Sequence, residues 1–193
     1  MSAKKILHIV GLIVAAVGAA MVFSAAVAAL YRSPDWLALL QAGAVSVLVG
    51  VALDRLTPRP TELTIRESYL IVSLAWLSAA IAGALPFWFA GAAGPLDAFF
   101  ESISGFTTTG ASIFPDPGSL TKGLQFWRGL TQWMGGMGII VLVVAVLPYL
   151  GVGGMQLFRA EVPGPTPERL QPRIKQTATI LWRVYVGLTA AQL

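Results

Sequence analysis

The chain has 193 residues, of which 56% are hydrophobic and 11% are charged, and its mean hydropathy is +0.74. Charged residues make up about 25% of a typical soluble domain, so we predict an integral membrane protein. The sequence contains no cysteine, which excludes disulfides, thiolate metal sites and thiol catalysis. The formal net charge is +4. In a membrane protein such a basic excess reports topology, so we expect a lipid bilayer as partner and no nucleic acid.

The first two apolar segments form an N-terminal region, residues 1–57. A pair of lysines precedes an uncharged run from Ile6 to Leu30, whose alanine-rich end resembles a signal-peptide cleavage site. The apolar core of a signal peptide has about 7–15 residues, whereas this run reaches the ~20 residues that cross a bilayer. We therefore predict a retained transmembrane helix. A tight turn around Pro34 and a second transmembrane helix, Trp36–Leu53, follow it.

Two further apolar segments are predicted to cross the membrane. The third runs from Ser68 to Leu96, and its helical part is expected to end at three helix-breaking positions, Pro86, Gly91 and Gly94. The fourth begins near Leu124 and continues to Leu150. A polar stretch with four prolines, Arg159–Lys175, is predicted to be a solvent-exposed loop. A fifth apolar segment starts near Thr177 and runs to the end of the sequence.

The distribution of basic residues predicts the topology. If the N-terminus lies in the cytoplasm, the outer side holds only Arg32, Lys122 and Arg128. The inner side then holds Lys4, Lys5, Arg55, Arg59, Arg66, Arg159, Arg169, Arg173, Lys175 and Arg183. This excess satisfies the positive-inside rule. The proline-rich loop is therefore expected to be cytoplasmic, and the segment between the third and fourth helices is expected to enter from outside.

That segment contains the most informative motif of the chain. The stretch Asp97–Ser104 is too short to cross a bilayer, and an uncharged, threonine-rich loop, Gly105–Ala111, follows it. Backbone without a helix is tolerated at membrane depth only where it is buried in protein or lines a water-filled path. We therefore predict a re-entrant pore helix and a loop that lines a cation path. A simple threonine-rich turn is the alternative.

The residue types of the loop suit a dehydrated monovalent cation. Backbone carbonyls of Thr107, Thr108, Thr109 and Gly110 can replace the hydration shell of such an ion. Gly110 can adopt backbone angles that other residues avoid. Each threonine hydroxyl provides either one more oxygen ligand or a bond to the wall. Gly105 stands where the C-cap of the short helix is expected, and the C-terminus of that helix would point its negative dipole end at the path.

Three motifs resemble the Trk/Ktr/HKT superfamily of potassium transporters, and the TrkH branch most closely. The stretch Phe99–Ala111 resembles the first pore loop of that superfamily. The stretch Trp127–Ile140 resembles the start of the helix after this loop, and Gly153–Glu161 resembles the cytoplasmic connection to the second repeat. Two additional N-terminal helices also fit the TrkH branch, so the resemblance covers nearly the whole chain.

The resemblance implies an all-α membrane protein with four membrane–pore–membrane repeats around one pore, each with a key glycine, here Gly110. It divides this chain into two N-terminal transmembrane helices (1–57), the first repeat (58–151), a cytoplasmic loop (152–176) and the start of a second repeat (177–193). It implies potassium at the filter oxygens of Thr108, Thr109 and Gly110, with Thr107 as a further filter residue. The supporting residues that it implies are Glu101, Gly105, Phe106, Ala111 and Arg128.

The implied function is potassium transport across the bacterial inner membrane, with one quarter of the selectivity filter in this chain. The implied partners are the remaining repeats, a homodimer of the full-length form and a cytoplasmic regulatory subunit that binds a nucleotide. No cofactor is expected in this chain, and no enzymatic acid–base pair is evident. Because the chain has one complete repeat, we expect a fragment or a truncated product that does not conduct alone. A non-conducting membrane scaffold or assembly subunit is the alternative.

Several polar side chains have more than one interpretation. Glu101 either attracts cations at the outer mouth or pins the loop to neighbouring backbone. Arg128 either pairs with Glu101 or Asp116 or extends to the membrane interface. His8 has no second histidine and no carboxylate in its own segment, so a metal or proton-relay role is not expected. The tryptophans are interpreted as interfacial anchors: Trp36, Trp76, Trp88, Trp127, Trp133 and Trp182.

Overall fold

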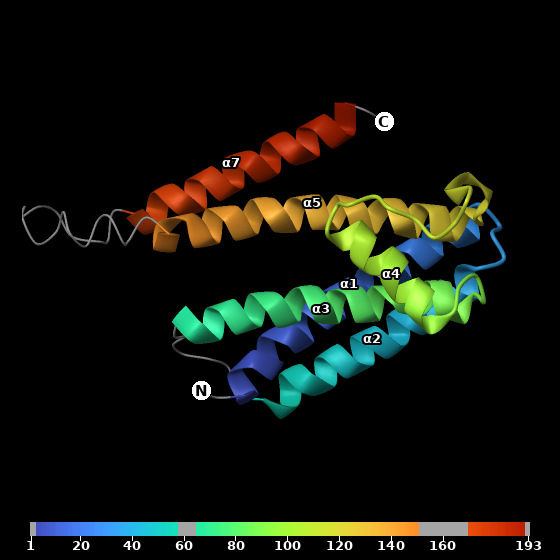
Figure 1. Cartoon of the computed structure of the whole chain (residues 1–193), viewed down its shortest axis with the longest axis horizontal. Helices are drawn as coiled ribbons and strands as arrows, with labels where there is room; N and C mark the ends of the chain where they lie inside the picture. Colours follow the sequence, from blue (N-terminus) through green and yellow to red (C-terminus); the bar gives the residue numbers. More distant parts are fainter. Residues whose placement is uncertain (1–2, 58–64, 151–169, 192–193) are drawn as a thin grey trace, which may run out of the picture. The chain divides into compact units, whose positions relative to one another are not determined.

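The computed structural model describes residues 3–57, 65–150 and 170–191, and all regular secondary structure in these ranges is helical (Figure 1). The elements are α1 (Ala3–Leu30), α2 (Trp36–Leu56), α3 (Ile65–Phe89), α4 (Pro95–Phe106), η1 (Pro117–Ser119), α5 (Lys122–Leu150) and α7 (Leu170–Ala191). The chain divides into two compact units, Met1–Trp133 and Met134–Leu193. The first unit contains the threonine-rich loop, which is the candidate functional site.

Three described helices are long and apolar enough to cross a membrane, as the sequence predicts. They are Ile6–Leu30, Trp36–Leu56 and Tyr69–Phe89, with mean hydropathies of 2.5, 2.1 and 2.0. The fourth predicted segment forms the 29-residue helix α5. The prediction that Arg159–Lys175 forms a loop is wrong for its last residues, because α7 begins at Leu170. Its Pro172 lies in the first turn of α7, where the missing N–H has no intrahelical partner to lose. The rest of that loop lies outside the described residues.

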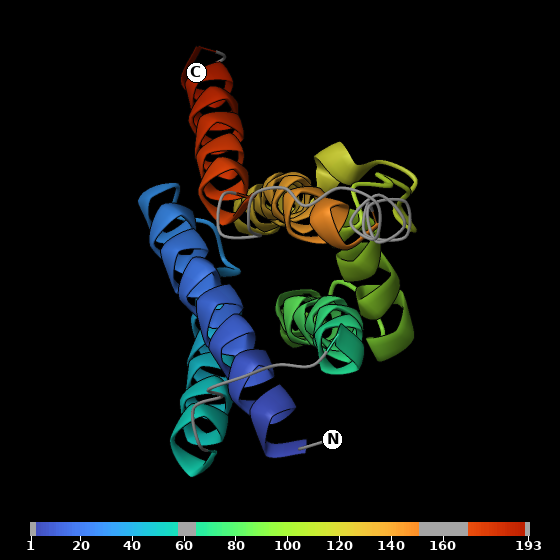
Figure 2. The same ribbon diagram turned by 90° about the vertical axis from the view of Figure 1, so that its left-hand side faces the viewer.

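The N-terminal helices α1 and α2 form a hairpin whose backbones approach closely, and both views show them side by side (Figures 1 and 2). A Cβ atom on Gly18 would lie 2.7 Å from the backbone nitrogen of Val47. Small residues at such a crossing let two membrane helices pack by van der Waals contact. The hairpin also joins His8 to Asp54, with 3.1 Å between His8 Nδ1 and Asp54 Oδ1. The carboxylate that His8 lacks in its own segment therefore comes from α2.

The end of α3 places the short helix α4. Pro86 lies inside α3, and the helix continues to Phe89, so the expectation that Pro86 helps to end it is wrong. The chain then turns at Gly91, whose φ is +68°. Ala92 N–H donates to the Phe87 carbonyl and Gly91 N–H to the Trp88 carbonyl, which is a Schellman motif with glycine in its left-handed position. Helix α4 starts after Gly94 with a proline at its first position.

In the second unit, α5 and α7 contact each other. A Cβ atom on Gly136 would lie 2.6 Å from the hydroxyl of Tyr185. At Gly136 the close contact is a packing contact.

Candidate functional site: the loop after α4 and its support

Helix α4 ends in a Schellman motif that starts the threonine-rich loop. Thr107 is the C-cap. Thr108 N–H donates to the Gly105 carbonyl (2.9 Å), and Thr109 N–H donates to the Ser104 carbonyl (3.0 Å). Thr108 occupies the left-handed position with φ = +58°. Glycine usually fills this position, and a β-branched residue there is a genuine outlier. Such strain persists only where the surrounding structure enforces it, and it often marks a functional site.

Gly105 is not the C-cap that the sequence predicts, because it lies inside α4 and is buried. A Cβ atom on Gly105 would lie less than 3.0 Å from Thr131 Oγ1 and 3.1 Å from Thr131 Cβ. Glycine is therefore needed at this position for the close approach of α4 to α5. A similar approach joins α4 to α3, since a Cβ atom on Gly83 would lie 2.7 Å from the ring of Phe106. Phe106 is accordingly buried, with 4% of its surface exposed.

Three consecutive carbonyls of the loop have no hydrogen-bond donor among the described residues. No hydrogen bond from the described parts of the chain reaches the carbonyl oxygens of Thr107, Thr108 or Thr109. The hydroxyls of Thr107 and Thr109 are 2.8 Å apart, and that of Thr107 donates to the Ile103 carbonyl. The Thr107 hydroxyl therefore bonds to the surrounding protein, at a carbonyl of α4. This is one of the two roles that the sequence predicts for the threonine hydroxyls, the other being an oxygen ligand of the ion. Gly110 has φ = +74°, so it uses the backbone freedom expected of it.

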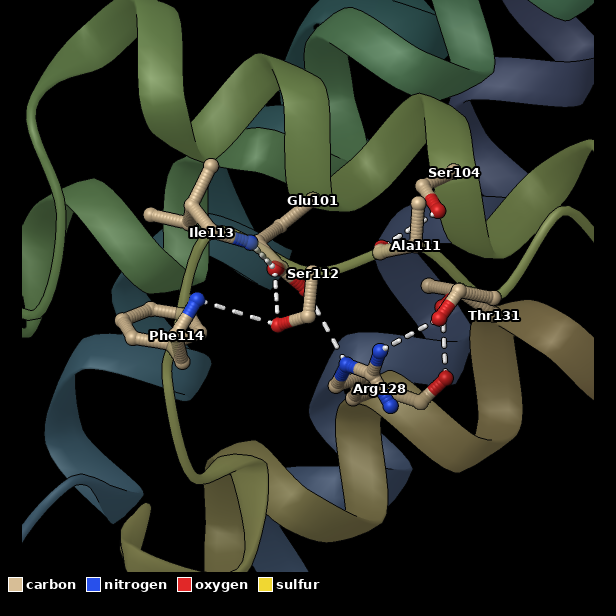
Figure 3. Close-up of polar contacts among 9 residues, drawn as sticks. Glu101, Ser104, Ala111, Ser112, Ile113, Phe114, Arg128 and Thr131 are labelled. Carbon is tan, nitrogen blue, oxygen red and sulfur yellow. Dashed lines mark hydrogen bonds and ion pairs between the residues drawn. The ribbon is translucent and has the colours of Figure 1, made fainter.

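Glu101 of α4 holds the segment that follows the loop (Figure 3). Its side chain is 0% exposed. Oε1 accepts hydrogen bonds from Ile113 N–H (2.7 Å) and from the Ser112 hydroxyl. The Ser112 hydroxyl in turn accepts from Phe114 N–H. A buried carboxylate with these partners ties the loop to α4, which is the second of the two roles considered for Glu101.

Arg128 of α5 links Glu101 to the loop itself. Its Nε donates to Glu101 Oε2 at 3.0 Å, which is one of the two ion pairs that the sequence leaves open. Its Nη2 donates to the Gly110 carbonyl at 3.3 Å. The Ser104 hydroxyl donates to the carbonyl of the exposed Ala111 (2.6 Å). The loop is therefore held at two consecutive carbonyls, which lie just after the three without partners.

The other acids near the loop have separate roles. Asp116 accepts from Gly118 N–H and caps η1, so it is not the partner of Arg128. Asp97 is exposed in the first turn of α4. Sequence reasoning missed Ser104, Ser112 and Thr131, although Ser104 follows Glu101 by three residues and so lies on the same face of α4. Within the described residues, no group of three or more His, Cys, Asp or Glu residues is placed to hold a metal ion.

One predicted anchor is instead a core residue. Trp127 is fully buried, and its indole N–H donates to the Gly83 carbonyl of α3 at 3.0 Å. The expectation that it lies at the membrane interface is wrong, because the close packing of α3, α4 and α5 gives the indole N–H a partner inside the protein.

These helices define an all-α membrane protein in which a short helix and a glycine-closed loop lie between two long helices. The family model described as TrkH, cation transport protein, matches residues 36–193. The chain belongs to this family.

The relatives share both sequence and fold with the chain. The Trk system potassium uptake protein TrkH of Salmonella typhimurium is 46% identical over 192 residues, which are 97% of this chain and 40% of that protein. The protein of the same name from Vibrio parahaemolyticus is 44% identical over 195 residues, 99% of this chain and 40% of that protein. The crystal structure of the potassium transporter TrkH from Vibrio parahaemolyticus superposes with a TM-score of 0.82 at 39% identity, and the match covers 99% of this chain and 38% of that one. The chain therefore spans about 40% of the length of the curated relatives that it matches.

Proposed function

We propose that this chain is the N-terminal part of a potassium transporter and contributes one quarter of its selectivity filter. The observation that carries the proposal is the run of three carbonyls, Thr107–Thr109, that accept no hydrogen bond from the described residues and lie beside a left-handed Gly110. The names of the matching relatives, which are potassium uptake proteins, support transport over the scaffold alternative. They also support a non-enzymatic role.

The proposed ligands are backbone oxygens. A potassium ion loses hydration water at the filter, and carbonyl dipoles replace that water. Thr108, Thr109 and Gly110 form the proposed potassium site, with Thr107 as a further oxygen. Because a carbonyl oxygen has two lone pairs, Gly110 can accept the bond from Arg128 and still present its second lone pair to the ion. The C-terminal end of α4, with its negative partial charge, adds to the attraction for a cation.

Glu101 and Arg128 have a supporting role in this proposal. A filter must hold its oxygens at a fixed separation, and non-helical backbone does this only when the wall around it is rigid. The ion pair between the half-buried Arg128 and the buried Glu101 connects α4, α5 and the segment after the loop. Its bond to Gly110 restrains the outermost proposed ligand. Gly105, Phe106 and Ala111 complete the support through the contacts to α5, α3 and Ser104 described above.

The proposed topology places the N-terminus in the cytoplasm of a bacterium and the loop at the outer side of the inner membrane. The proposed domains are those predicted: two N-terminal helices (1–57), the first repeat (58–151), a cytoplasmic segment (152–176) that includes the first turns of α7, and the start of a second repeat (177–193). A reporter fused at Gly164, which lies outside the described residues, is expected to be cytoplasmic. A periplasmic signal from that fusion contradicts the topology.

A complete filter needs three more loops, so the proposed partners are the remaining repeats of the same transporter. The relatives are named as members of a Trk system, which supports further components. The further partners that we propose are a second copy of the full-length protein, in a homodimer, and a cytoplasmic subunit that binds a nucleotide. Potassium is the substrate, and we propose no cofactor for this chain.

The filter proposal is tested with Gly110→Asp in a chimera in which this chain replaces the matching 40% of the Escherichia coli TrkH relative. Aspartate tolerates left-handed backbone, so the main change is a charge beside the ion. At about 4 Å and an effective dielectric constant of 20, that charge adds about 4 kcal/mol of attraction. This slows release of the ion by more than about a hundredfold.

The assay is potassium uptake in a strain deficient in potassium uptake. We expect Gly110→Asp to abolish or strongly reduce it. Gly91→Asp is the matched control, because Gly91 also has positive φ and a side chain there meets open space, yet it lies outside the loop. Unchanged uptake and ion preference in Gly110→Asp refute the filter assignment.

A further inference from the structure

The turn between α1 and α2 has a strained geometry that aims two polar side chains inward. Helix α1 ends in a Schellman motif in which Arg32 is left-handed, with φ = +52°. Ser33 N–H donates to the Ala28 carbonyl, and Arg32 N–H donates to the Ala29 carbonyl. Ser33 and Asp35 follow and are each 5% exposed. Polar side chains buried this deeply need hydrogen-bond partners, and α5 supplies them.

The N-terminus of α5 is capped by this turn and not by its own residues. Thr121 precedes the helix, where its hydroxyl would ordinarily accept a bond from the N–H of Leu124. That N–H donates instead to Asp35 Oδ2 at 2.6 Å. The Thr121 hydroxyl itself donates to Asp35 Oδ2, and Gly123 N–H donates to Ser33 Oγ at 3.3 Å. Two orphan N–H donors of α5 are therefore satisfied by a turn that lies 90 and 89 positions earlier in the chain.

Residues around this cap pack tightly against one another. A Cβ atom on Gly123 would lie 2.6 and 2.7 Å from the two carboxylate oxygens of Asp35, and 2.8 Å from Ala28 Cβ. Glycine is thus required for Asp35 to reach the helix end. The rings of Phe23 and Phe126 extend the contact between α1 and α5, with centroids 5.9 Å apart. The donors to Asp35 described here are all neutral, and the positive end of the α5 dipole stabilises its charge.

The capped part of α5 is the part that holds the loop. In the turns after the cap, Trp127 donates to α3 and Arg128 donates to Glu101 and to the Gly110 carbonyl. Thr131 then fills the space beside Gly105. The residues of α5 that hold the loop lie within about two helical turns of the cap. Because the rise per residue of a helix is fixed, an axial shift of the N-terminus of α5 moves these residues as well.

We propose that Asp35 is a positioning residue, which ties the N-terminal hairpin to the loop after α4 by capping α5 from outside the repeat. The hairpin then has a task beyond membrane anchoring. It fixes the depth and rotation of the helix that carries Arg128. The expected effect on ion preference rests on the proposed function, whereas the effect on the loop does not.

The test uses the full 193-residue chain in membranes and exploits its lack of native cysteine. Ala111→Cys places one thiol on the exposed part of the loop, and its rate of reaction with a membrane-impermeant thiol reagent reports loop order. Asp35→Ala is expected to raise that rate by about twofold to thirtyfold, the range that loss of an N-cap produces. Asp54→Ala is the matched control, because it removes a hairpin acid that pairs within the hairpin. It should leave the rate unchanged.

A second variant separates the stabilisation of the α5 N-terminus from the connection between the hairpin and the loop. Thr121→Asp, added to Asp35→Ala, gives α5 a cap from its own N-cap residue. We expect it to restore the melting temperature but not the slow thiol reaction. If the thiol rate also returns to the wild-type value, or if Asp35→Ala never changes it, the proposal is overturned. Should both variants fail to fold, Gly123→Ala displaces the Asp35 carboxylate, because the added Cβ atom lies 2.6 and 2.7 Å from its two oxygens. An unchanged thiol rate in that protein overturns the proposal equally.

Transport gives an independent readout. In the Escherichia coli chimera, Asp35→Ala is expected to lower the preference for potassium over sodium by a similar factor. If the wild-type chimera does not transport at all, the proposed function is wrong, and the thiol measurement still decides the role of Asp35.

Discussion

Replacing Gly105 with alanine should destabilise the protein, although the same change normally stabilises a helix. Gly105 lies within α4 and not at its end. The added methyl group would lie less than 3.0 Å from Thr131 Oγ1, on the neighbouring helix α5. Thr131 is 1% exposed, and its hydroxyl donates to the Arg128 carbonyl. It therefore has little room to move away.

The magnitude follows from two opposing effects. Glycine inside a helix is less favourable than alanine by about 0.5–1 kcal/mol, and overpacking a tight contact costs about 1–3 kcal/mol. The net result for Gly105→Ala is a loss of between zero and about 2.5 kcal/mol. Gly129 provides the matched control, since it lies in α5 and an added Cβ meets nothing within 4 Å. Gly129→Ala should therefore stabilise by about 0.5–1 kcal/mol.

The assay is thermal unfolding in detergent micelles, followed by circular dichroism. For a chain of this size, 1 kcal/mol corresponds to roughly 2–4 °C in melting temperature, so the two variants should shift in opposite directions. Thr131→Ala removes the hydroxyl and should reduce the cost of Gly105→Ala when the two are combined. If Gly105→Ala melts at or above the wild-type temperature, as Gly129→Ala should, then the close approach of α4 to α5 is wrong.

Two predictions concern the loop. Arg128→Lys keeps a charge for Glu101 but has one nitrogen where arginine uses two, so it should retain most of the stability and lose the bond to Gly110. Uptake assays in the chimera should then show weaker potassium preference, and an unchanged preference contradicts the support role. Thr108→Gly removes a left-handed, β-branched residue that costs about 1–2 kcal/mol. Its melting temperature should equal or exceed that of the wild type, while Thr109→Gly, at a position without positive φ, should melt lower.

Local sequence predicted the long helices well. The length of an uncharged apolar run and the requirement of about 20 residues per span are enough to locate the three membrane-spanning helices of the first unit. Proline at the start of α4 and glycine in the turn after α3 have backbone preferences that act within a few residues. The loop was also located, because a short apolar stub followed by threonines and glycine stands out between long helices.

The same local reasoning failed at Gly105 and Trp127. A glycine that ends a helix and a glycine that admits a neighbouring helix look alike in a sequence. In this chain Thr108 adopts the left-handed conformation expected of a glycine. A tryptophan near a helix end likewise looks like an interfacial anchor until a carbonyl of another helix is found beside its indole N–H.

The sequence by itself determined the class of protein, the long helices and the threonine-rich loop, because each depends on hydropathy or backbone preference over adjacent residues. Tertiary structure alone decided which interpretation of Glu101 and Arg128 holds, and it alone revealed Asp35 as the cap of α5. The partners in these contacts are separated by 27 and 89 positions in the chain. No local propensity encodes such pairs, because they form only when the packing of the helices has excluded water and brought each buried charge and N–H group within reach of its partners.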